Sequence, residues 1–361
     1  MNNKIRVLAI SSSAKTGGGP NHIFLLKNLL EDNFDFYLSM PSIQDKNIEF
    51  KKYLKISERK ILPADLIRLI IFARKNRINI IHAHGKGAGL IGRIIKIFLR
   101  KPLIYTFHGI HTDCLCNLKK FLYIVYENMT GWLVDEKIFV SSSEKNQAQN
   151  LKIIIGNNYR IINNSTKNKN IKQNCFQNNN KVFGIDNNKK NIISVCRLVD
   201  QKNIFEIFKI AKNLKIYNFI VLGEGYLIYN ARKYIKKNNI NNVYLLGNKS
   251  DVFKYLKESD LFLSTSLYEG HPISILEAMS IGLPIVASNV IGNFDTIKNN
   301  HSGLFYKIGD IKEASKCITD IINDENLKLK FSINAYDRHR KFFSTQKMQN
   351  SYISLYKKYF R

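Results

Sequence analysis

The sequence lacks several patterns that would place the protein in particular classes. It has five cysteines among 361 residues, an odd number, and none of them form a C-x-x-C pair. This argues against a disulfide framework and against a structural zinc site. No apolar run approaches the length of a membrane span, and the run VLAI near the N-terminus is too short for the core of a signal peptide. We therefore expect a cytoplasmic protein.

Acidic residues are scarce relative to basic ones. The chain has 28 Asp and Glu against 56 Lys and Arg, a formal net charge of +28. From Lys51 to Lys101 there are fourteen basic residues and two acids, and Arg93, Lys96 and Arg100 share one stripe of an expected helix. This region predicts either peripheral contact with an anionic membrane, at the cytoplasmic face of the inner membrane, or an ordinary solvated basic surface. No nucleic-acid partner is expected, because no RNA-binding or helix-turn-helix signature is present.

Two familiar nucleotide-binding motifs are also missing. The glycine-rich stretch TGGGPNH does not have the spacing G-x-G-x-x-G, and no G-K-[ST] follows it. The next expected strand, FDFYLSM, ends without the acid that would hold the ribose of NAD. The glycines Gly17, Gly18 and Gly19 are therefore interpreted in two ways: they let backbone amides approach a phosphate or sugar, or they form a simple turn.

Strands and helices alternate along most of the chain, which predicts an α/β protein with parallel sheets. A first series of expected strands comprises KIRVLAIS, FDFYLSM, INIIHAHG, KPLIYTFHG and KIFVSSS. A second series comprises NIISVCRL, NFIVLGEG, NVYLLGN, DLFLSTS and LPIVASN. A polar segment rich in Asn and Lys separates them. We predict an N-terminal domain over 1–165, a connection over 166–190, a C-terminal domain over 191–345 and a terminal helix over 346–361. Two such domains would face each other across a cleft.

The second series carries a specific arrangement of charge. Arg197 directly follows an expected strand and Lys202 comes five residues later, which suits a diphosphate. Glu269 and Glu277 flank the start of a helix that is expected to open at Pro272. A helix N-terminus attracts anions, so the two carboxylates are predicted to accept hydrogen bonds from sugar hydroxyls beside the diphosphate.

Histidines gather after two strands of the first series. His82 and His84 share one face of an expected strand and are interpreted as packed or surface residues, whereas His108 follows the next strand and is predicted to face the cleft. No carboxylate or cysteine completes a recognisable ligand set, so no metal site is predicted.

Taken together, these motifs resemble the retaining glycosyltransferases of glycosyltransferase family four, which have the GT-B fold of two Rossmann-like domains. The stretch from Leu245 to Ser288 is the long and specific part of the resemblance. The matching segments are TGGGPNHIFLL, IIHAHGKGAGLIGR, KPLIYTFHG, FVSSSE, IINNS, SVCRLVDQKN, VLGEG, YLLGNKSDVFKYLKESDLFLSTSLYEGHPISILEAMSIGLPIVAS and GLFY.

The resemblance implies a role for each matching residue. Glu269 and Glu277 would form the family's E-x(7)-E element, the first on the transferred sugar and the second on the donor ribose. Arg197 and Lys202 would bind the diphosphate, and His108 the sugar near the reacting carbon. The remaining implied substrate contacts are Gly17, Gly18, Gly19, Gly223, Glu224, Gly225, Asn248, Lys249, Gly270, His271, Pro272 and Ile273.

Two residues depart from the family pattern. Cys196 and Asn164 stand where relatives usually have glycine, which puts in doubt the backbone of the loops around them. The resemblance also implies that the terminal helix crosses back to the N-terminal domain.

The resemblance implies a glycosyltransferase that retains anomeric configuration and uses a nucleotide-sugar donor, UDP more than GDP. The transferred sugar would be a hexose or N-acetylhexosamine, and the acceptor a lipid-linked or cell-envelope glycan. No Asp-x-Asp motif is present, so neither a metal nor another cofactor is expected. Alternatives from the sequence are a sugar-nucleotide epimerase of the same fold, a phosphorylase-like enzyme and a non-catalytic sugar-nucleotide-binding module.

Overall fold

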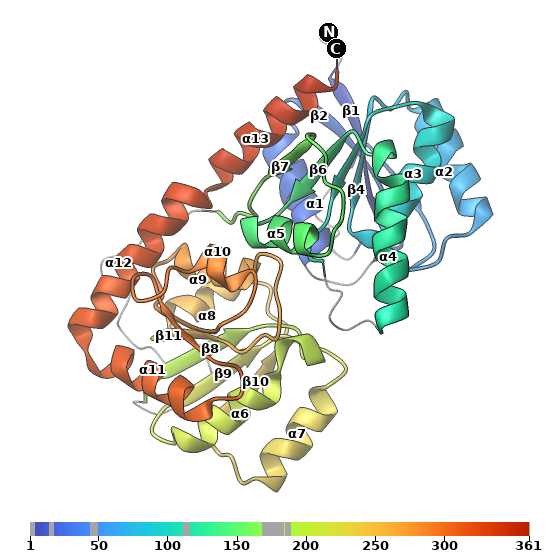
Figure 1. Ribbon diagram of the computed structural model, residues 1–361. Helices are drawn as coiled ribbons and strands as arrows, with labels where there is room; N and C mark the ends of the chain where they lie inside the picture. Colours follow the sequence, from blue (N-terminus) through green and yellow to red (C-terminus); the bar gives the residue numbers. More distant parts are fainter. Residues whose placement is uncertain are drawn as a thin grey trace. The chain divides into compact units, whose positions relative to one another are not determined.

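The computed structural model describes residues 4–13, 18–43, 50–110, 116–167, 184 and 189–360. Within these ranges the chain forms two compact α/β units (Figure 1). The first unit comprises Met1–Asn164 and Thr345–Arg361, and the second comprises Ser165–Ser344. Most of the predicted connection 166–190 lies outside the described residues.

A parallel seven-stranded sheet forms the centre of the first unit, in the order β3-β2-β1-β4-β5-β6-β7. Its strands are β1 (Ile5–Ser11), β2 (Phe34–Met40), β3 (Lys52–Lys55), β4 (Ile80–His84), β5 (Leu103–Thr106), β6 (Glu136–Phe139) and β7 (Tyr159–Ile161). The strand order reverses between β1 and β4. Loops at the carboxyl ends of such neighbouring strands leave the sheet in opposite directions, which makes room for a ligand there.

Helices cover both faces of this sheet. The helices of the first unit are α1 (Gly18–Leu30), α2 (Pro63–Lys75), α3 (Lys86–Leu99), α4 (Asn117–Thr130), α5 (Ser142–Asn150) and α13 (Thr345–Lys358), with a 3₁₀ turn η1 (Gly131–Leu133) after α4. Because strand side chains alternate between faces, Ile81 packs in the cluster with α2, α3, α4 and α5, while Ile80 packs with α1 and α13.

The last helix, α13, belongs to the first unit, as the fold prediction expected. Tyr352 and Tyr356 on α13 are fully buried against it. Their hydroxyls lie 3.0 Å from His22 Nε2 and 2.7 Å from His82 Nδ1. The helix is therefore an integral layer of the first unit, although it ends the chain.

The second unit has a parallel six-stranded sheet in the order β10-β9-β8-β11-β12-β13. Its strands are β8 (Asn191–Val195), β9 (Asn218–Leu222), β10 (Val243–Gly247), β11 (Leu261–Ser264), β12 (Ile285–Ser288) and β13 (Leu304–Tyr306). Its helices are η3 (Asp200–Lys202), α6 (Ile204–Asn213), α7 (Ile228–Lys237), α8 (Val252–Lys257), α9 (Ile273–Met279), α10 (Asn293–Thr296), α11 (Ile311–Asn323) and α12 (Glu325–Phe342). Here the strand order reverses between β8 and β11, so the loops that carry Arg197 and Glu269 follow neighbouring strands at the same edge of the sheet.

The helix after Glu269 is shorter than predicted. Pro272 flanks α9 as its N-cap instead of opening it, with extended backbone angles of φ −74° and ψ 111°. The helix ends at Met279, three residues before the expected stop at Gly282. Glu277 nevertheless lies in the second turn, as predicted.

The predicted basic stripe on α3 is wrong at Arg93. This side chain is buried, its guanidinium lies 2.5 Å from Glu127 of α4, and it packs against the rings of Tyr105 and Tyr126. Lys96 is paired with Asp135, so only Arg100 of the three is exposed and without a recorded ion pair among the described residues. Among those residues, too, no helix combines the length and the apolar character that crossing a bilayer requires.

Candidate functional site

The strand reversal between β8 and β11 brings together two of the predicted charged residues. Lys202 Nζ, at the end of η3, forms a salt bridge with Glu269 Oε1, in the loop after β11. Both side chains are largely buried, with 14% and 9% of their surface exposed. An ammonium and a carboxylate are thus held next to each other at the carboxyl edge of the sheet.

The loops that carry this pair are fastened to each other by hydrogen bonds. Thr265 Oγ1 donates to the carbonyl of Lys202 over 2.8 Å, and the side-chain Nε2 of Gln201 donates to the carbonyl of Tyr268 over 3.0 Å. Ser266 Oγ donates to Glu269 Oε1 over 2.6 Å. Two acceptor bonds therefore orient Oε1, and Glu269 Oε2 has no recorded partner among the described residues. That oxygen is the one available to a ligand hydroxyl.

Two glycines set the backbone that carries Arg197. A Cβ on Gly223, which has φ +128°, would lie 2.0 Å from the carbonyl oxygen of Cys196, and one on Gly225 would lie 2.2 Å from that of Leu198. The amide of Leu198 donates to the Glu224 carbonyl over 3.0 Å, which closes the two loops on each other. These glycines are needed for close approach of backbone to backbone.

Cys196 fits this loop as an apolar residue. It packs against the hydrophobic core of the second unit, and burial raises the pKa of its thiol to about 11. The departure from the family's glycine therefore adds a small, partly buried side chain that packs on the core of the second unit.

Glu224, Asn248 and Lys249 lie at the ends of β9 and β10, as their positions after strands predict. Asn248 Nδ2 donates to Glu224 Oε2 over 3.2 Å, and the Lys249 ammonium lies 5.6 Å from the centre of the Tyr255 ring. All three side chains remain accessible enough to meet a ligand.

The residues between the two glutamates divide into interior and partly exposed positions. His271 is buried, its ring centre lies 5.0 Å from that of Phe343, and burial lowers its pKa to about 3. Its side chain thus contributes to packing. Gly270 and Ile273 remain partly exposed beside the Lys202–Glu269 pair, whereas Pro272 is buried.

Glu277 differs from Glu269 in having no cationic partner. No ion pair is recorded for its carboxylate within the described ranges, and burial raises the pKa of this side chain to about 7. The Glu277 carboxyl is therefore about half protonated near neutral pH. A hydrogen bond donated by a ligand would stabilise its charged form.

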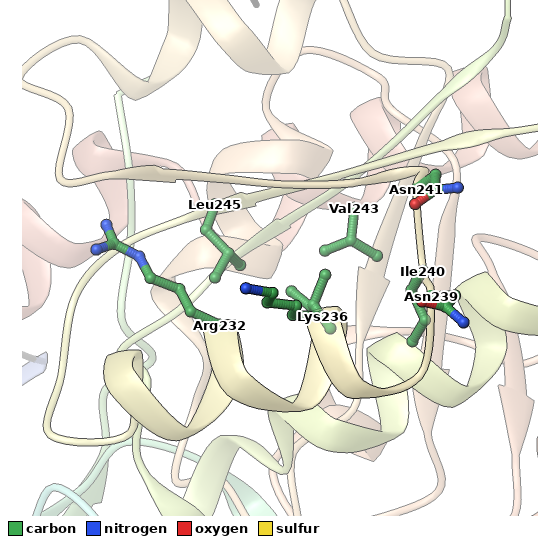
Figure 2. Close-up of a pocket in the computed structure, with 8 residues that line it drawn as sticks. Arg232, Lys236, Asn239, Ile240, Asn241, Val243 and Leu245 are labelled. Atoms are coloured by element: carbon green, nitrogen blue, oxygen red, sulfur yellow. The ribbon is translucent and has the colours of Figure 1, made fainter.

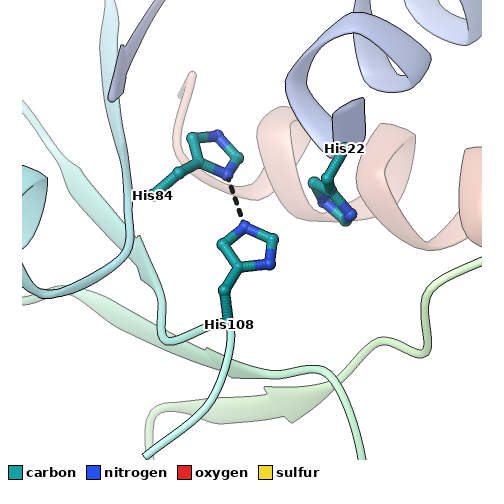
Figure 3. A group of neighbouring side chains, drawn as sticks. All are labelled: His22, His84 and His108. Atoms are coloured by element: carbon teal, nitrogen blue, oxygen red, sulfur yellow. Dashed lines mark hydrogen bonds between the residues drawn. The ribbon is translucent and has the colours of Figure 1, made fainter. Parts of the chain in front are cut away.

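In the first unit, the predicted histidines form a compact group together with one that the sequence did not single out (Figure 3). His84 Nδ1 lies 3.1 Å from His108 Nε2, and the His22 ring centre lies 4.7 Å from that of His108. His82 stacks near His84 and bonds Thr106, so His82 and His84 are packed residues rather than surface residues. Burial lowers the pKa of all four well below its ordinary value, to about 4 for His22.

His108 stands in a strained backbone conformation at this site. Its φ is +57°, a left-handed value that is uncommon for residues other than glycine. Such strain is typically found at functional sites, where the surrounding structure enforces it. A Cβ on Gly19 would lie 3.9 Å from the His108 ring. The predicted glycine turn is wrong at Gly18 and Gly19, because both lie in the first turn of α1, which borders His108. Gly18 begins α1, and Gly17 lies outside the described residues.

One ring nitrogen from each of His22, His84 and His108 lies within 4.8 Å of the other two, which is close enough for the three side chains to bind one metal ion after small movements. However, His22 Nδ1 is bonded to Asn164 Oδ1 at 3.0 Å and its Nε2 to the Tyr352 hydroxyl. His84 Nδ1 is bonded to His108. The nitrogens are thus mostly occupied by partners within the protein, and the absence of a metal stays a prediction.

A separate hollow of about 420 Å³ lies on the second unit between α7 and the edge strand β10 (Figure 2). Arg232 and Lys236 reach over it from α7, and Val243 and Leu245 form its apolar floor. It includes none of the residues predicted from the motifs.

Sequence reasoning missed the residues that position the charged groups. Ser266 and Thr265 directly follow a strand and come within four residues of Glu269, which is a usable signal. Asn164 and His22 lie 142 residues apart, and only the fold brings them into contact. The departure at Asn164 therefore supplies an acceptor that fixes His22.

Comparison with known proteins gives a consistent result. The model of Glycosyltransferase Family 4 matches residues 17–166, and that of Glycosyl transferases group 1 matches residues 175–338. The chain is 28% identical over 284 residues to the UDP-Gal:alpha-D-GlcNAc-diphosphoundecaprenol alpha-1,3-galactosyltransferase of Escherichia coli, covering 73% of this chain and 71% of the relative. It is 26% identical over 314 residues to the capsular polysaccharide biosynthesis glycosyltransferase CapM of Staphylococcus aureus, covering 81% and 80%.

Solved structures agree on the fold. HepE of Anabaena, in its complex with UDP-glucose, matches with a TM-score of 0.85 at 17% identity, covering 97% of this chain and 99% of HepE. At this identity the likeness concerns the fold alone, and it confirms the two Rossmann-like units expected from the sequence.

Proposed function

Because the chain belongs to the glycosyltransferases, with matches to both the Glycosyltransferase Family 4 model and the Glycosyl transferases group 1 model, we propose that it transfers a hexose or N-acetylhexosamine from a UDP-sugar to a lipid-linked or cell-envelope glycan. The observation that carries this proposal is the Lys202–Glu269 pair at the strand reversal of the second unit. The names of the relatives support the substrates: the Escherichia coli relative uses UDP-Gal and a diphosphoundecaprenol acceptor, and CapM takes part in capsule biosynthesis.

The pair suits the charge changes of glycosyl transfer. When the bond between the anomeric carbon and the diphosphate breaks, negative charge grows on the leaving phosphate and positive charge on the sugar. Arg197 and Lys202 would stabilise the first, and Glu269 would hold the sugar through its free Oε2. In the proposed assignment Glu277 binds the ribose, and His108 contacts the sugar near the reacting carbon.

We propose retention of configuration by a front-face reaction. The acceptor hydroxyl attacks the anomeric carbon on the face from which the diphosphate leaves, and its proton passes to a phosphate oxygen. The two cations would stabilise that leaving group without a metal. This mechanism needs no carboxylate nucleophile.

The test is transfer of a labelled sugar from a panel of UDP- and GDP-sugars to a lipid-diphosphate glycan acceptor, with and without EDTA. We expect acceptor-dependent transfer that survives chelation and a product whose anomeric configuration matches the donor. Nucleotide release without acceptor would indicate an epimerase, and donor binding without turnover would indicate a binding module. Loss of transfer in EDTA that magnesium or manganese restores would contradict the metal-independent mechanism.

Variants of the pair test the assignment of Glu269. Glu269→Gln keeps the shape of the side chain and removes its charge, so we expect kcat to fall roughly 10²–10³-fold while donor affinity stays within about threefold. Ser266→Ala is the matched control, because it removes only one hydrogen bond to Oε1 and should cost about tenfold or less. Normal kcat in Glu269→Gln would remove Glu269 from the reaction.

A further inference from the structure

The helix α4 exposes an apolar face where a surface helix normally exposes polar residues. Four of its side chains are among the exposed large hydrophobic residues of the protein: Leu118 (67%), Phe121 (61%), Leu122 (56%) and Met129 (71%). Trp132, in the turn η1 that directly follows, is 78% exposed. Contiguous exposed apolar residues of this size mark an interaction surface.

The orientation of α4 is fixed from its other side. Glu127 is buried against Arg93 of α3, while Tyr123 and Ile124 pack on the core. At roughly 100° per residue, the four exposed side chains lie within about 60° of the direction opposite Glu127. The apolar face therefore points outward as a consequence of the Arg93–Glu127 pair.

Most charges beside this face are basic, and the acid Asp135, which follows η1, is paired with Lys96. Glu127 is the only acid in α4, and it is buried, whereas Lys119 and Lys120 stand in the first turn. Beside α4, the end of α3 exposes Ile97 and Phe98 and is followed by the exposed Arg100 and Lys101. Apolar side chains flanked by Lys and Arg match the surface of an anionic lipid bilayer, with acyl chains below and phosphate groups around them.

We propose that the outer face of α4, with Trp132, docks the protein on an anionic phospholipid membrane. The proposal rests on the proposed function, because a lipid-linked acceptor is presented at such a surface. The outer face of α4 also replaces the predicted basic stripe on α3 as the proposed centre of contact with the membrane.

The face also lies at the same end of the sheet as the His108 group. The ammonium of Lys86, which directly follows β4 and Gly85, lies 4.4 Å from the ring centre of Tyr123. The first half of α4 is therefore beside the carboxyl end of β4, where His84 contacts His108. Docking through Leu118, Phe121 and Leu122 would hold that edge of the first unit next to the headgroups.

Trp132 provides a direct test, because it is the only tryptophan in the chain. We expect its emission to shift to shorter wavelength, and its quenching by iodide to decrease, when vesicles of phosphatidylglycerol and phosphatidylcholine are added to the full-length protein. Pure phosphatidylcholine vesicles should produce a much smaller change. No spectral change with anionic vesicles overturns the proposal, and it does so independently of whether the protein transfers any sugar.

Matched variants locate the contact. The double variant Phe121→Ser/Leu122→Ser should lower co-sedimentation with the anionic vesicles by about tenfold or more, since each apolar side chain loses its burial in the bilayer. Ile216→Ser/Leu329→Ser removes two similarly exposed apolar side chains of the second unit and should bind as the wild type does. Met129→Ser checks the same face, should the first variant melt at a lower temperature.

Two further readouts separate the alternatives. Sedimentation velocity without vesicles should give the same mass for wild type and double variant; dissociation of a dimer by the double variant would assign the face to a second copy and overturn membrane docking. Transfer to a short-chain, water-soluble acceptor should be unchanged in the double variant. Inactivity of the wild type toward every acceptor, with vesicle binding intact, would reject the proposed function and leave the docking surface.

Discussion

At the scale of single residues, the pairing of Lys202 with Glu269 explains how a largely buried ammonium is accommodated at the carboxyl edge of the second sheet. A largely buried ammonium is costly, and the carboxylate compensates for it. A diphosphate that binds Arg197 and Lys202 takes over part of that compensation and leaves Glu269 free to turn toward the sugar. Removal of either partner alone leaves a buried charge, so kinetics of these variants should be read together with their melting temperatures.

Glu277 carries a prediction about pH. Its pKa is raised to about 7, so the carboxyl is largely protonated at pH 6 and ionised at pH 8. Ribose hydroxyls donate more strongly to the ionised form. We therefore expect the Kd for UDP to decrease as the pH rises through about 7 and to level off above about pH 8, as measured by calorimetry. Glu277→Gln, which cannot ionise, should bind more weakly and show a flat profile over this range.

The phosphate of UDP also titrates near pH 6, and the control separates the two effects. Uridine has no phosphate, so its binding should keep the pH dependence in the wild type and lose it in Glu277→Gln. Identical pH profiles in the two proteins would contradict ribose binding by Glu277.

At the scale of elements, the tight contact between the loops after β8 and β9 yields a prediction on Gly223. A methyl group there would lie 2.0 Å from the Cys196 carbonyl oxygen and would force the Arg197 loop away. We expect Gly223→Ala to destabilise the second unit by about 2–4 kcal/mol and to weaken UDP binding at least about tenfold.

Gly309 provides the comparison for this substitution. It also has a positive φ, +84°, but a Cβ there would have nothing within 4 Å. Gly309→Ala should therefore cost only the backbone strain, about 1 kcal/mol, and leave UDP binding unchanged. Equal effects in the two variants would show that the close approach at Gly223 has no separate importance. Urea unfolding and calorimetry provide both measurements.

Elements with a strong pattern were predictable from the sequence, and those that depend on distant partners were not. Apolar strands such as NFIVL and IIHAH were found because burial on both faces requires continuous hydrophobic residues. The short edge strands β3 (Lys52–Lys55), β7 (Tyr159–Ile161) and β13 (Leu304–Tyr306) have only three or four residues each and little pattern. They are held by pairing with a neighbour that is already in place.

The same distinction applies to the candidate site. Arg197, Lys202 and Glu269 follow strands and were recognised by charge and position. Arg93 was misinterpreted because helical periodicity shows which residues share a stripe but does not show that Glu127, on another helix, compensates a buried guanidinium. His22 was missed because its partners, Asn164 and Tyr352, are far away in the sequence.

At the scale of the whole molecule, the buried histidines predict sensitivity to mild acid. His22, His82, His84 and His108 have pKa values in the folded state below the ordinary value of 6.5, because burial disfavours their charged form. Below about pH 6.5 the unfolded chain binds protons that the folded chain does not. The contribution of these histidines to the free energy of unfolding should be constant above this pH and fall as the pH decreases toward about 4, by up to about 1.4 kcal/mol per pH unit for each histidine. Glu277, whose pKa is raised to about 7, contributes in the opposite direction as the pH falls below about 7.

Urea unfolding at a series of pH values, followed by far-UV circular dichroism, tests this expectation. His22→Gln removes one of the buried titrating groups and should flatten the decrease between about pH 6.5 and about pH 5. His301→Gln is the control, since His301 is exposed in the second unit. A wild-type stability that stays constant down to about pH 5 would mean that the histidines take up protons in the folded state as readily as in the unfolded one.

The position of α13 has a consequence for how the protein is made. The ribosome completes residues 1–164 first, yet the helix that covers one face of their sheet is translated last. The 180 residues of the second unit come between, a delay of roughly 10–40 s at about 5–20 residues per second. During that time the nascent first unit presents Ile80, Ile104 and Ile138 without Tyr352 and Tyr356 to cover them. Truncation of the chain before Tyr352 would therefore leave this face of the first unit uncovered, and chaperones that bind nascent chains would be needed most while the second unit is being synthesised.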